Sequence, residues 1–253
     1  MSAVGVIIQA RTGSTRLKNK ILIPFYQDQG ILEILIDKIL HGLTGTPIVL
    51  ATSTGEENDI LADLAARKGI NCFRGDEANV LKRFIEASRH YKITGAVRIC
   101  ADNPFLDAHY LSQLVNYAEA HEEFDYISFQ LSDGRPTIRS HHGFFAEFVQ
   151  LSALRKVQTV TTEPSYLEHV TNYIYENPAD FNIKWLPAPS VVSNRLDIRL
   201  TIDTEDDFKS AQEILKLLGK APLQISLNEI IDVVDRHPML ITKMEGQIKA
   251  NEK

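Results

Sequence analysis

The stretch VIIQARTGSTRLKNK, residues 6–20, sets the architecture expected of this chain. It begins as an apolar run typical of a buried strand and continues as a loop with one glycine, three small hydroxyl side chains and four cations. The glycine lets the backbone approach an anion closely, while Arg11, Arg16, Lys18 and Lys20 offer compensating charge. We therefore predict a polyphosphate-binding loop, with a solvated basic loop after an edge strand as the alternative.

Size and charge limit the classes of protein to consider. At 253 residues with 44% hydrophobic content, the chain can bury a full core, and no linker or low-complexity tract divides it. We expect one domain over residues 1–245 and a loose polar tail over residues 246–253. The net charge of −6 argues against nonspecific binding of nucleic acid, so an anionic ligand must be met by local cations.

The cysteines and the hydropathy pattern indicate a protein of a reducing compartment. Cys72 and Cys100 lie in apolar runs without the spacing of metal ligands, which is typical of buried thiols. No charged leader precedes the first apolar run, and no apolar stretch approaches the length of a membrane span. These patterns predict a cytoplasmic protein that does not associate with a membrane.

Short apolar runs alternate with helical patterns through the first half of the chain. The runs are rich in β-branched residues and are expected to be strands covered on both faces, over residues 4–10, 48–52, 70–73 and 96–100. Helical patterns between them occupy residues 30–40, 57–68 and 79–92. This alternation predicts an α/β fold with three layers around a mostly parallel sheet.

The pattern becomes irregular after a further helix expected over residues 107–120. Residues 126–131 and 143–149 have the pattern of strands joined by a turn, which predicts either mixed strand directions or a small antiparallel flap. After these we expect a helix over 164–176, strands over 181–186 and 199–202, and helices over 205–218 and 227–236. Pro238 is expected to stop the last helix.

Two aspartates are expected where strands end and loops begin. Asp102 follows the strand predicted at 96–100, and Asp203 follows the strand predicted at 199–202. Ligands bind at this edge of an open α/β sheet, so the two carboxylates and the basic loop would together hold Mg²⁺ and substrate phosphates. For either aspartate alone, the alternative is a helix N-cap, because apparent helices begin at Pro104 and Glu205.

The basic loop and both aspartate segments resemble one enzyme family. Gln-Ala-Arg-x-Gly-Ser-x-Arg-Leu-x-x-Lys after a first strand resembles the nucleotide loop of the sugar cytidylyltransferases, which are CMP-sugar synthetase-like enzymes, and within them the spore-coat polysaccharide (SpsF-like) branch. Residues 101–105, ADNPF, resemble the family's Asp-x-Pro element, and residues 200–206, LTIDTED, resemble its Leu-Thr-Val-Asp-Thr-x-Glu-Asp element. Residues 73–84 and 168–178 also resemble family segments. One departure is Lys18-Asn19, which stands where the family usually has Pro-Gly.

This resemblance implies a nucleotidyltransferase with the three-layer, Rossmann-like fold of the nucleotide-diphospho-sugar transferases. It further implies Mg²⁺ as cofactor, CTP as donor, release of pyrophosphate and a homodimer. The implied catalytic residues are Arg11, Lys20, Asp102 and Asp203, with the two aspartates as metal ligands. The implied nucleotide-binding residues are Gln9, Ala10, Arg11, Gly13, Ser14, Arg16, Lys20, Arg74, Arg83 and Ala101. For Arg74 and Arg83, a solvated helix face is the alternative.

The acceptor is inferred from a second departure from the family pattern. The family commonly has an acidic Gly-x-Asp-Val-Glu-Val-Phe stretch where residues 139–147 read RSHHGFFAE. The positive balance predicts an anionic acceptor, either a sugar acid or a phosphorylated sugar-like compound, used for surface polysaccharide or glycoconjugate biosynthesis. Its expected contacts are Arg135, His142, Glu168, His169 and Arg199. The alternatives are a solvated basic hairpin and, for His169, a histidine buried in a helix.

Two other functions remain open at this stage. A nucleotide-sugar glycosyltransferase of the same fold normally has an Asp-x-Asp metal motif, which Asp102-Asn103-Pro104 does not supply. A nucleotide-binding protein without catalysis, acting as a partner in polysaccharide assembly, would have no need to keep both aspartates and Lys20.

Overall fold

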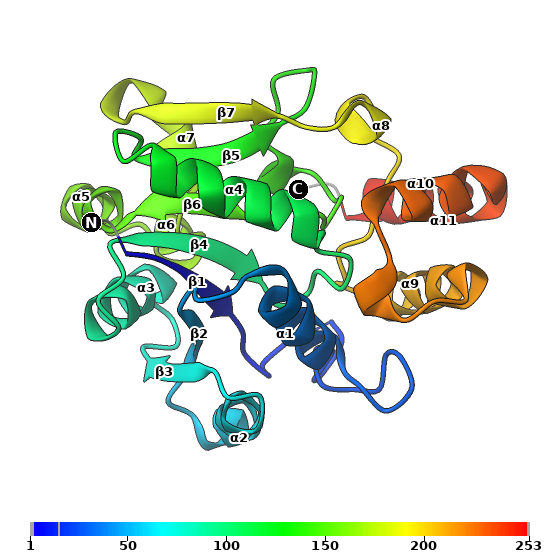
Figure 1. The fold of residues 1–253 in the computed structure, drawn as a ribbon, viewed down its shortest axis with the longest axis horizontal. Helices are drawn as coiled ribbons and strands as arrows, with labels where there is room; N and C mark the ends of the chain where they lie inside the picture. Colours follow the sequence, from blue (N-terminus) through cyan, green and yellow to red (C-terminus); the bar gives the residue numbers. More distant parts are fainter. Residues whose placement is uncertain (1–2, 15, 252–253) are drawn as a thin grey trace.

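A seven-stranded sheet forms the middle of the protein in the computed structural model, which describes residues 3–14 and 16–251 (Figure 1). Its strand order is β3-β2-β1-β4-β6-β5-β7. The strands are β1 (Val4–Gln9), β2 (Ile48–Ser53), β3 (Asn71–Gly75), β4 (Gly95–Cys100), β5 (Tyr126–Gln130), β6 (Glu147–Gln150) and β7 (Ile183–Pro187).

The sheet is mixed but mostly parallel. β1 pairs in parallel with β2 and β4, β2 with β3, and β5 with β7, while β6 is antiparallel to both β4 and β5. The predicted α/β class with mixed strand directions is therefore confirmed. The antiparallel element is a strand inserted into the main sheet rather than a separate flap, and it begins at Glu147 instead of residue 143.

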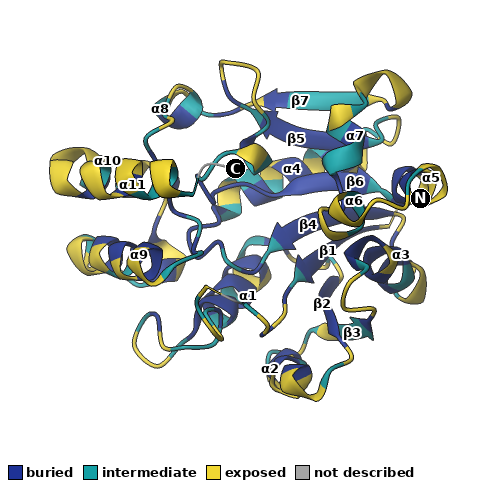
Figure 2. Ribbon diagram, turned by 180° about the vertical axis from the view of Figure 1, so that it is seen from behind, coloured by how far each residue is buried: buried dark blue, intermediate teal, exposed yellow. Residues whose placement is uncertain are grey.

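Helices cover both faces of the sheet and complete three layers (Figures 1 and 2). One buried cluster joins Val6 and Ile8 to α1, α2, α4, α9, α10 and α11, and another joins Ile7 to α3, α5 and α7. Side chains alternate along a strand, so β1 is buried on both faces. The helices are α1 (Ile31–Gly42), α2 (Asp59–Arg67), α3 (Val80–His90), α4 (Ala108–Ala120), α5 (Leu151–Val160), α6 (Pro164–Glu168), α7 (Asn172–Glu176), α8 (Ser190–Ser193), α9 (Glu205–Leu218), α10 (Leu227–Arg236) and α11 (Pro238–Ala250).

The helix predicted over residues 164–176 is wrong as one continuous element. It is divided into α6 and α7 by a short connection in which Val170 and Thr171 are fully buried. The Thr171 hydroxyl donates to the buried carboxylate of Glu147 at 2.9 Å, and this inward contact interrupts the helix. As a result, Glu168 is the last residue of α6 and His169 is its C-cap, so neither lies in the middle of a helix.

The strand predicted over residues 199–202 is also absent from the described chain. The backbone there bonds to loops instead of to a strand: Leu200 N–H donates to the His141 carbonyl at 2.8 Å, and Ile202 N–H donates to the Asp102 carbonyl at 3.0 Å. The second of these bonds still brings residue 203 beside residue 102.

The loose tail predicted from residue 246 is wrong for residues 246–250, which complete α11. Pro238 occupies the first turn of this helix, where its missing N–H costs nothing, so it begins α11 as well as following α10. Leu240 and Met244 are buried against the rest of the protein. Residues 252 and 253 of the predicted tail lie outside the described residues. Within the described chain, the helices are too short or too polar to cross a membrane.

Candidate active site

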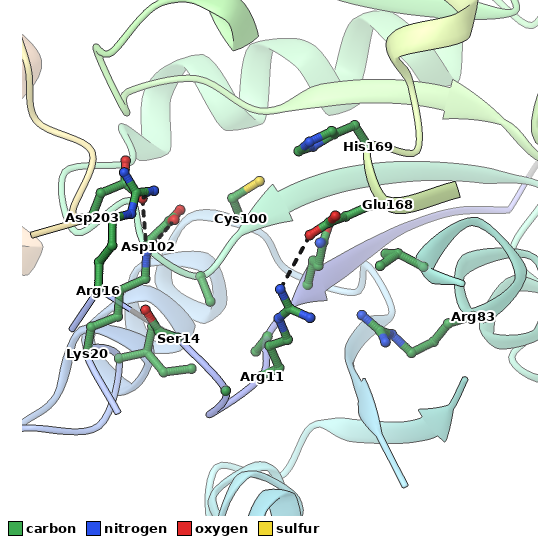
Figure 3. Close-up of a pocket in the computed structure, with 16 residues that line it drawn as sticks. Arg11, Ser14, Arg16, Lys20, Arg83, Cys100, Asp102, Glu168, His169 and Asp203 are labelled. Atoms are coloured by element: carbon green, nitrogen blue, oxygen red, sulfur yellow. Dashed lines mark hydrogen bonds and ion pairs between the residues drawn. The ribbon is translucent and has the colours of Figure 1, made fainter. Parts of the chain in front are cut away.

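The candidate site lies at the carboxyl ends of β1 and β4. These strands are parallel neighbours, with Gln9 opposite Cys100, and the chain leaves them toward opposite edges of the sheet, from β1 to β2 on one side and from β4 to β5 on the other. A crevice forms where the strand order of an open sheet reverses in this way, and here it contains a cavity of about 300 Å³ (Figure 3). Most of the predicted residues line it: Gln9, Ala10, Arg11, Gly13, Ser14, Arg16, Lys20, Arg83, Ala101, Asp102, Glu168, His169 and Asp203.

Lys20 joins the two aspartates. Its Nζ lies 2.9 Å from Oδ2 of Asp102, 3.5 Å from Oδ1 of Asp203 and 2.5 Å from the carbonyl oxygen of Ile202 (Figure 3). Burial favours the neutral amine, but the two carboxylates outweigh it, so the pKa of Lys20 is raised. The ammonium therefore stays charged and holds both carboxylates at the cavity.

Helix capping does not explain either aspartate. The N-cap of α4 is Asp107, whose carboxylate accepts from two backbone N–H groups of the first turn. The N-cap of α9 is Thr204, and Asp207 completes its capping box. Asp102 and Asp203 are thus left at 30% and 25% side-chain exposure, with their carboxylates available to the cavity.

A buried arginine fixes the position of Asp203. The Arg199 guanidinium is fully buried and donates to Asp207 at 2.7 and 3.0 Å and to Oδ2 of Asp203 at 3.1 Å. It also contacts Nδ1 of His141 at 2.8 Å. Burial, followed by the charge of Arg199, lowers the pKa of His141, so this imidazole is the acceptor in that contact. Arg199, predicted to bind substrate, uses all three of its guanidinium nitrogens in bonds to protein groups.

The two arginines of the loop make exposed contacts. Arg16 donates to Asp203 at 2.9 Å and to the side-chain oxygen of Asn251 at 3.1 Å, and Arg11 pairs with Glu168 at 3.3 Å. Exposed ion pairs contribute little free energy, so an incoming phosphate can replace them. Arg83 is buried and donates to the carbonyl of Asp76 at 2.7 Å.

Two predicted residues are not at the site. Arg74 pairs with Asp59 at 2.5 Å and donates to three loop carbonyls, so it is turned toward the start of α2. His142 is 1% exposed, and its Nε2 donates to the carbonyl of Arg195 at 2.6 Å. His141, the residue before it, lines the second cavity in its place.

A second cavity, of about 740 Å³, adjoins the first. Arg16, Cys100, Asp102, His169 and Asp203 line both cavities, so the two aspartates lie between them. The predicted residues Arg135 and Arg199 line the second cavity. Residues there that sequence reasoning missed are Arg98, Asn172, Tyr175 and Asn251.

Both cysteines were expected to be buried thiols, but Cys72 and Cys100 are only half-buried. Cys100 is a free cysteine that lines both cavities. Burial raises the pKa of its thiol to about 11, so it remains protonated at neutral pH and is a weak nucleophile.

His142 gives a prediction for stability. Burial lowers its pKa below the ordinary value of 6.5, and its Nδ1 is buried without a partner that could accept a proton. Below pH 6.5 this histidine binds a proton in the unfolded chain but not in the folded chain. The free energy of unfolding should therefore fall as the pH drops, by up to about 1.4 kcal/mol per pH unit for this one proton. Chemical denaturation of wild type and His142→Gln across this range measures it. A slope that is unchanged in His142→Gln contradicts the prediction, and the exposed His41→Asn is the matched control.

Comparison with known proteins identifies the family. The chain matches the cytidylyltransferase family over residues 5–232. It is 33% identical over 251 residues to the spore coat polysaccharide biosynthesis protein SpsF of Bacillus subtilis, covering 97% of this chain and 100% of that protein. The chain belongs to the cytidylyltransferase family. This cytidylyltransferase is also 38% identical over 240 residues to an uncharacterized protein of Methanocaldococcus jannaschii, covering 95% of this chain and 93% of that protein.

A solved structure agrees with this assignment. A cytidylyltransferase from Leptospira borgpetersenii serovar Hardjo-bovis superposes with a TM-score of 0.83 at 27% identity, covering 95% of this chain and 97% of that one. The fold is that of the nucleotide-diphospho-sugar transferases, as predicted. The protein is therefore a nucleotidyltransferase that uses CTP. This family assignment favours neither the glycosyltransferase nor the non-catalytic partner that the sequence left open.

Proposed function

We propose that this cytidylyltransferase transfers CMP from CTP to an anionic, sugar-like acceptor during surface polysaccharide or glycoconjugate biosynthesis. The observation that carries the proposal is the pair of adjoining cavities with Asp102 and Asp203 between them. CTP occupies the cavity beside the basic loop, and the acceptor occupies the larger one. The reacting atoms then meet at the two aspartates.

The chemistry needs alignment and charge stabilisation, without a covalent intermediate. An oxygen of the acceptor attacks the α-phosphorus of CTP, and the bond to the bridging oxygen breaks as pyrophosphate leaves with its electron pair. Arg11, Arg16 and Lys20 bind the β- and γ-phosphates and stabilise the charge that develops on the leaving group. Gly13 and Ser14 line the same end of the cavity, where backbone and hydroxyl donors reach phosphate.

Asp102 and Asp203 fit Mg²⁺ as two ligands of an open site. Each has an oxygen within 3.5 Å of the same Lys20 nitrogen, so the carboxylates are close enough to share one cation. The described residues contain no group of three or more His, Cys, Asp or Glu side chains able to hold a metal. That agrees with Mg²⁺, which takes one or two carboxylates and completes its shell with phosphate oxygens and water. When bound, the ion neutralises charge on the phosphates.

The charge of the larger cavity supports an anionic acceptor. Arg139 lines it and forms no ion pair within the described chain, and Arg135 is 47% exposed with only a 3.6 Å contact to Asp133. The positive charge comes from these arginines, because His142 faces away and the lowered pKa of His141 keeps that ring neutral. Carboxylate and phosphate are the groups that arginine binds best.

The acceptor assignment predicts that Arg139→Ala lowers kcat/KM for an anionic acceptor by about tenfold to a hundredfold, the usual loss for a charge-assisted hydrogen bond. The KM for CTP should change little, because Arg139 lies outside the CTP cavity. Pyrophosphate release at varied acceptor concentration measures both constants. The exposed Arg155→Ala, on α5, is the control.

The function is tested by mixing the protein with CTP, Mg²⁺ and matched pairs of neutral and anionic sugars. Release of pyrophosphate with the anionic members supports the proposal. Turnover of neutral sugars alone, unaffected by Arg139→Ala, contradicts the acceptor class. The homodimer implied by the family resemblance stays a prediction, which sedimentation measures.

A further inference from the structure

A polar triad with two buried members crosses three adjacent strands beneath the CTP cavity. It consists of Gln9 on β1, Arg98 on β4 and Glu147 on β6, and Arg98 and Glu147 are directly paired across their strands. The side chains of Arg98 and Glu147 are only 6% and 1% exposed. Nη1 of Arg98 lies 2.5 Å from Oε1 of Glu147, and its Nε and Nη2 lie 3.1 and 3.0 Å from Oε1 of Gln9.

The triad fixes which end of the Gln9 amide is free. An arginine has five N–H donors and no acceptor, so the Gln9 atom that faces Arg98 must be the carbonyl oxygen. The amide nitrogen makes no hydrogen bond within the described part of the chain, and it is not sealed off from the cavity as a buried unpartnered atom. Because Gln9 lines the CTP cavity, it offers N–H donors there.

Arg98 is itself held in place. Both oxygens of Glu147 are engaged, Oε1 by Arg98 and by the Thr171 hydroxyl at 2.9 Å, and Oε2 by the hydroxyl of Tyr126. Rotating the Gln9 amide by half a turn would set its NH₂ group against the guanidinium and lose two charge-assisted bonds. The donor is therefore oriented before any nucleotide binds.

The position of Gln9 suits contact with the base. The end of the cavity with Lys20, Asp102 and Asp203 holds the phosphates in the proposed function, and this inference rests on that assignment. In the close-up view Arg83 lies at the opposite end from these three residues (Figure 3). Gln9 directly precedes the phosphate loop, and the uncharged residues Ala10, Val80 and Ala101 line the same cavity. A flat ring fits against such uncharged residues.

We propose that Arg98 fixes Gln9 as a hydrogen-bond donor to N3 of cytosine, and that this contact selects CTP over UTP. N3 of cytosine is an acceptor, whereas N3 of uracil carries a hydrogen and would meet a second donor. A donor facing a donor leaves both groups desolvated and unpaired. Gln9 reads the base, and Arg98 is the positioning residue.

Gln9→Glu is the direct test. The carboxylate keeps both contacts from Arg98 but presents an acceptor to the cavity, which matches N3–H of uracil. The added negative charge affects both triphosphates alike, so it cancels in their ratio. The ratio of CTP to UTP affinity, measured by calorimetry with Mg²⁺, should fall by about tenfold to a hundredfold, the range expected when one buried hydrogen bond is exchanged for a mismatch. Gln158→Glu, exposed on α5, is the control for charge.

A double variant, Arg98→Met with Glu147→Gln, tests the positioning role. It removes the buried charges together, because removal of one would leave the other unpaired and destabilise the fold. With its anchor gone, the Gln9 amide can present either end, so CTP should still bind while the CTP-to-UTP ratio falls by about tenfold. A role in stability alone would lower the melting temperature without changing the ratio.

The outcomes separate this inference from the proposed function. If wild type prefers CTP and Gln9→Glu keeps the wild-type ratio or loses both nucleotides equally, the base contact is wrong and the function stands. If the double variant folds and keeps the wild-type ratio, Arg98 is not the positioning residue. If wild type binds neither nucleotide, the CTP cavity itself is misassigned and the inference fails with it.

Discussion

Replacing either Asp102 or Asp203 with asparagine is expected to lower turnover by about a hundredfold or more while the fold is retained. Both carboxylates contact Lys20 and line both cavities, so both lie where donor and acceptor meet. An amide keeps the size of the side chain but loses the charge that holds Lys20 and suits Mg²⁺. Pyrophosphate release at limiting Mg²⁺ measures turnover, and circular dichroism checks the fold.

The matched control is Asp206→Asn, an exposed aspartate in the first turn of α9, only three residues beyond Asp203. It should keep turnover near wild type, since it lines a separate cavity between α9 and α11 and neither of the two cavities that Asp102 and Asp203 line. A folded Asp102→Asn or Asp203→Asn protein with near-normal turnover at limiting Mg²⁺ would remove that aspartate from the site. Loss of a helix cap cannot explain a fall in turnover for either residue, because neither aspartate caps a helix.

The sequence could predict that Asp102 and Asp203 lie close together, but not the backbone structure that brings Asp203 there. Parallel strands end at one edge of a sheet, and that rule places Asp102 correctly after β4. Asp203 reaches the same place without a strand, because Ile202 N–H bonds to the carbonyl of Asp102. A short β-branched run is compatible with an extended loop as well as with a strand, and its local pattern does not distinguish them.

The triad beneath the CTP cavity shows a second limit of sequence reasoning. Arg98 is visible in the sequence as a charge inside an apolar strand, and such a charge must be paired when buried. Its partner, Glu147, is 49 residues away, on a strand whose antiparallel insertion follows from tertiary packing. The sequence indicates that a partner exists but does not identify it.

The side chains of loops and of the last helix were the hardest to place. His141 and His142 are adjacent in an irregular segment with no periodicity to show which one faces the cavity. Helix α11 did carry a signal, since Leu240 and Met244 are spaced for one helix face. Proline after a helix indicates a stop, but it suits the first turn of a new helix equally well, and Pro238 does both. The sequence alone does not choose between these roles, so it does not predict that Asn251 contacts Arg16 from the end of α11.

Lys20→Ala is expected to lower kcat/KM by about tenfold to a thousandfold, the range for loss of a charged contact to a reacting phosphate. The ammonium is mostly buried, at 13% exposure, and it separates two carboxylates that would otherwise repel one another. Its removal therefore weakens binding of the triphosphate and loosens the arrangement of Asp102 and Asp203. Steady-state kinetics with varied CTP at saturating Mg²⁺ measures the loss.

Lys18→Ala is the control for charge in the same loop. Lys18 is exposed, lines neither of the cavities that contain Asp102 and Asp203, and forms no ion pair within the described chain. Its removal should therefore change kcat/KM by less than about threefold, as expected for an exposed charge that acts only at long range. Comparable losses for the two lysines would mean that the loop acts as a diffuse basic patch. A large loss at Lys20 alone would show that the geometry around one ammonium, rather than the total charge of the loop, carries the contact with the triphosphate.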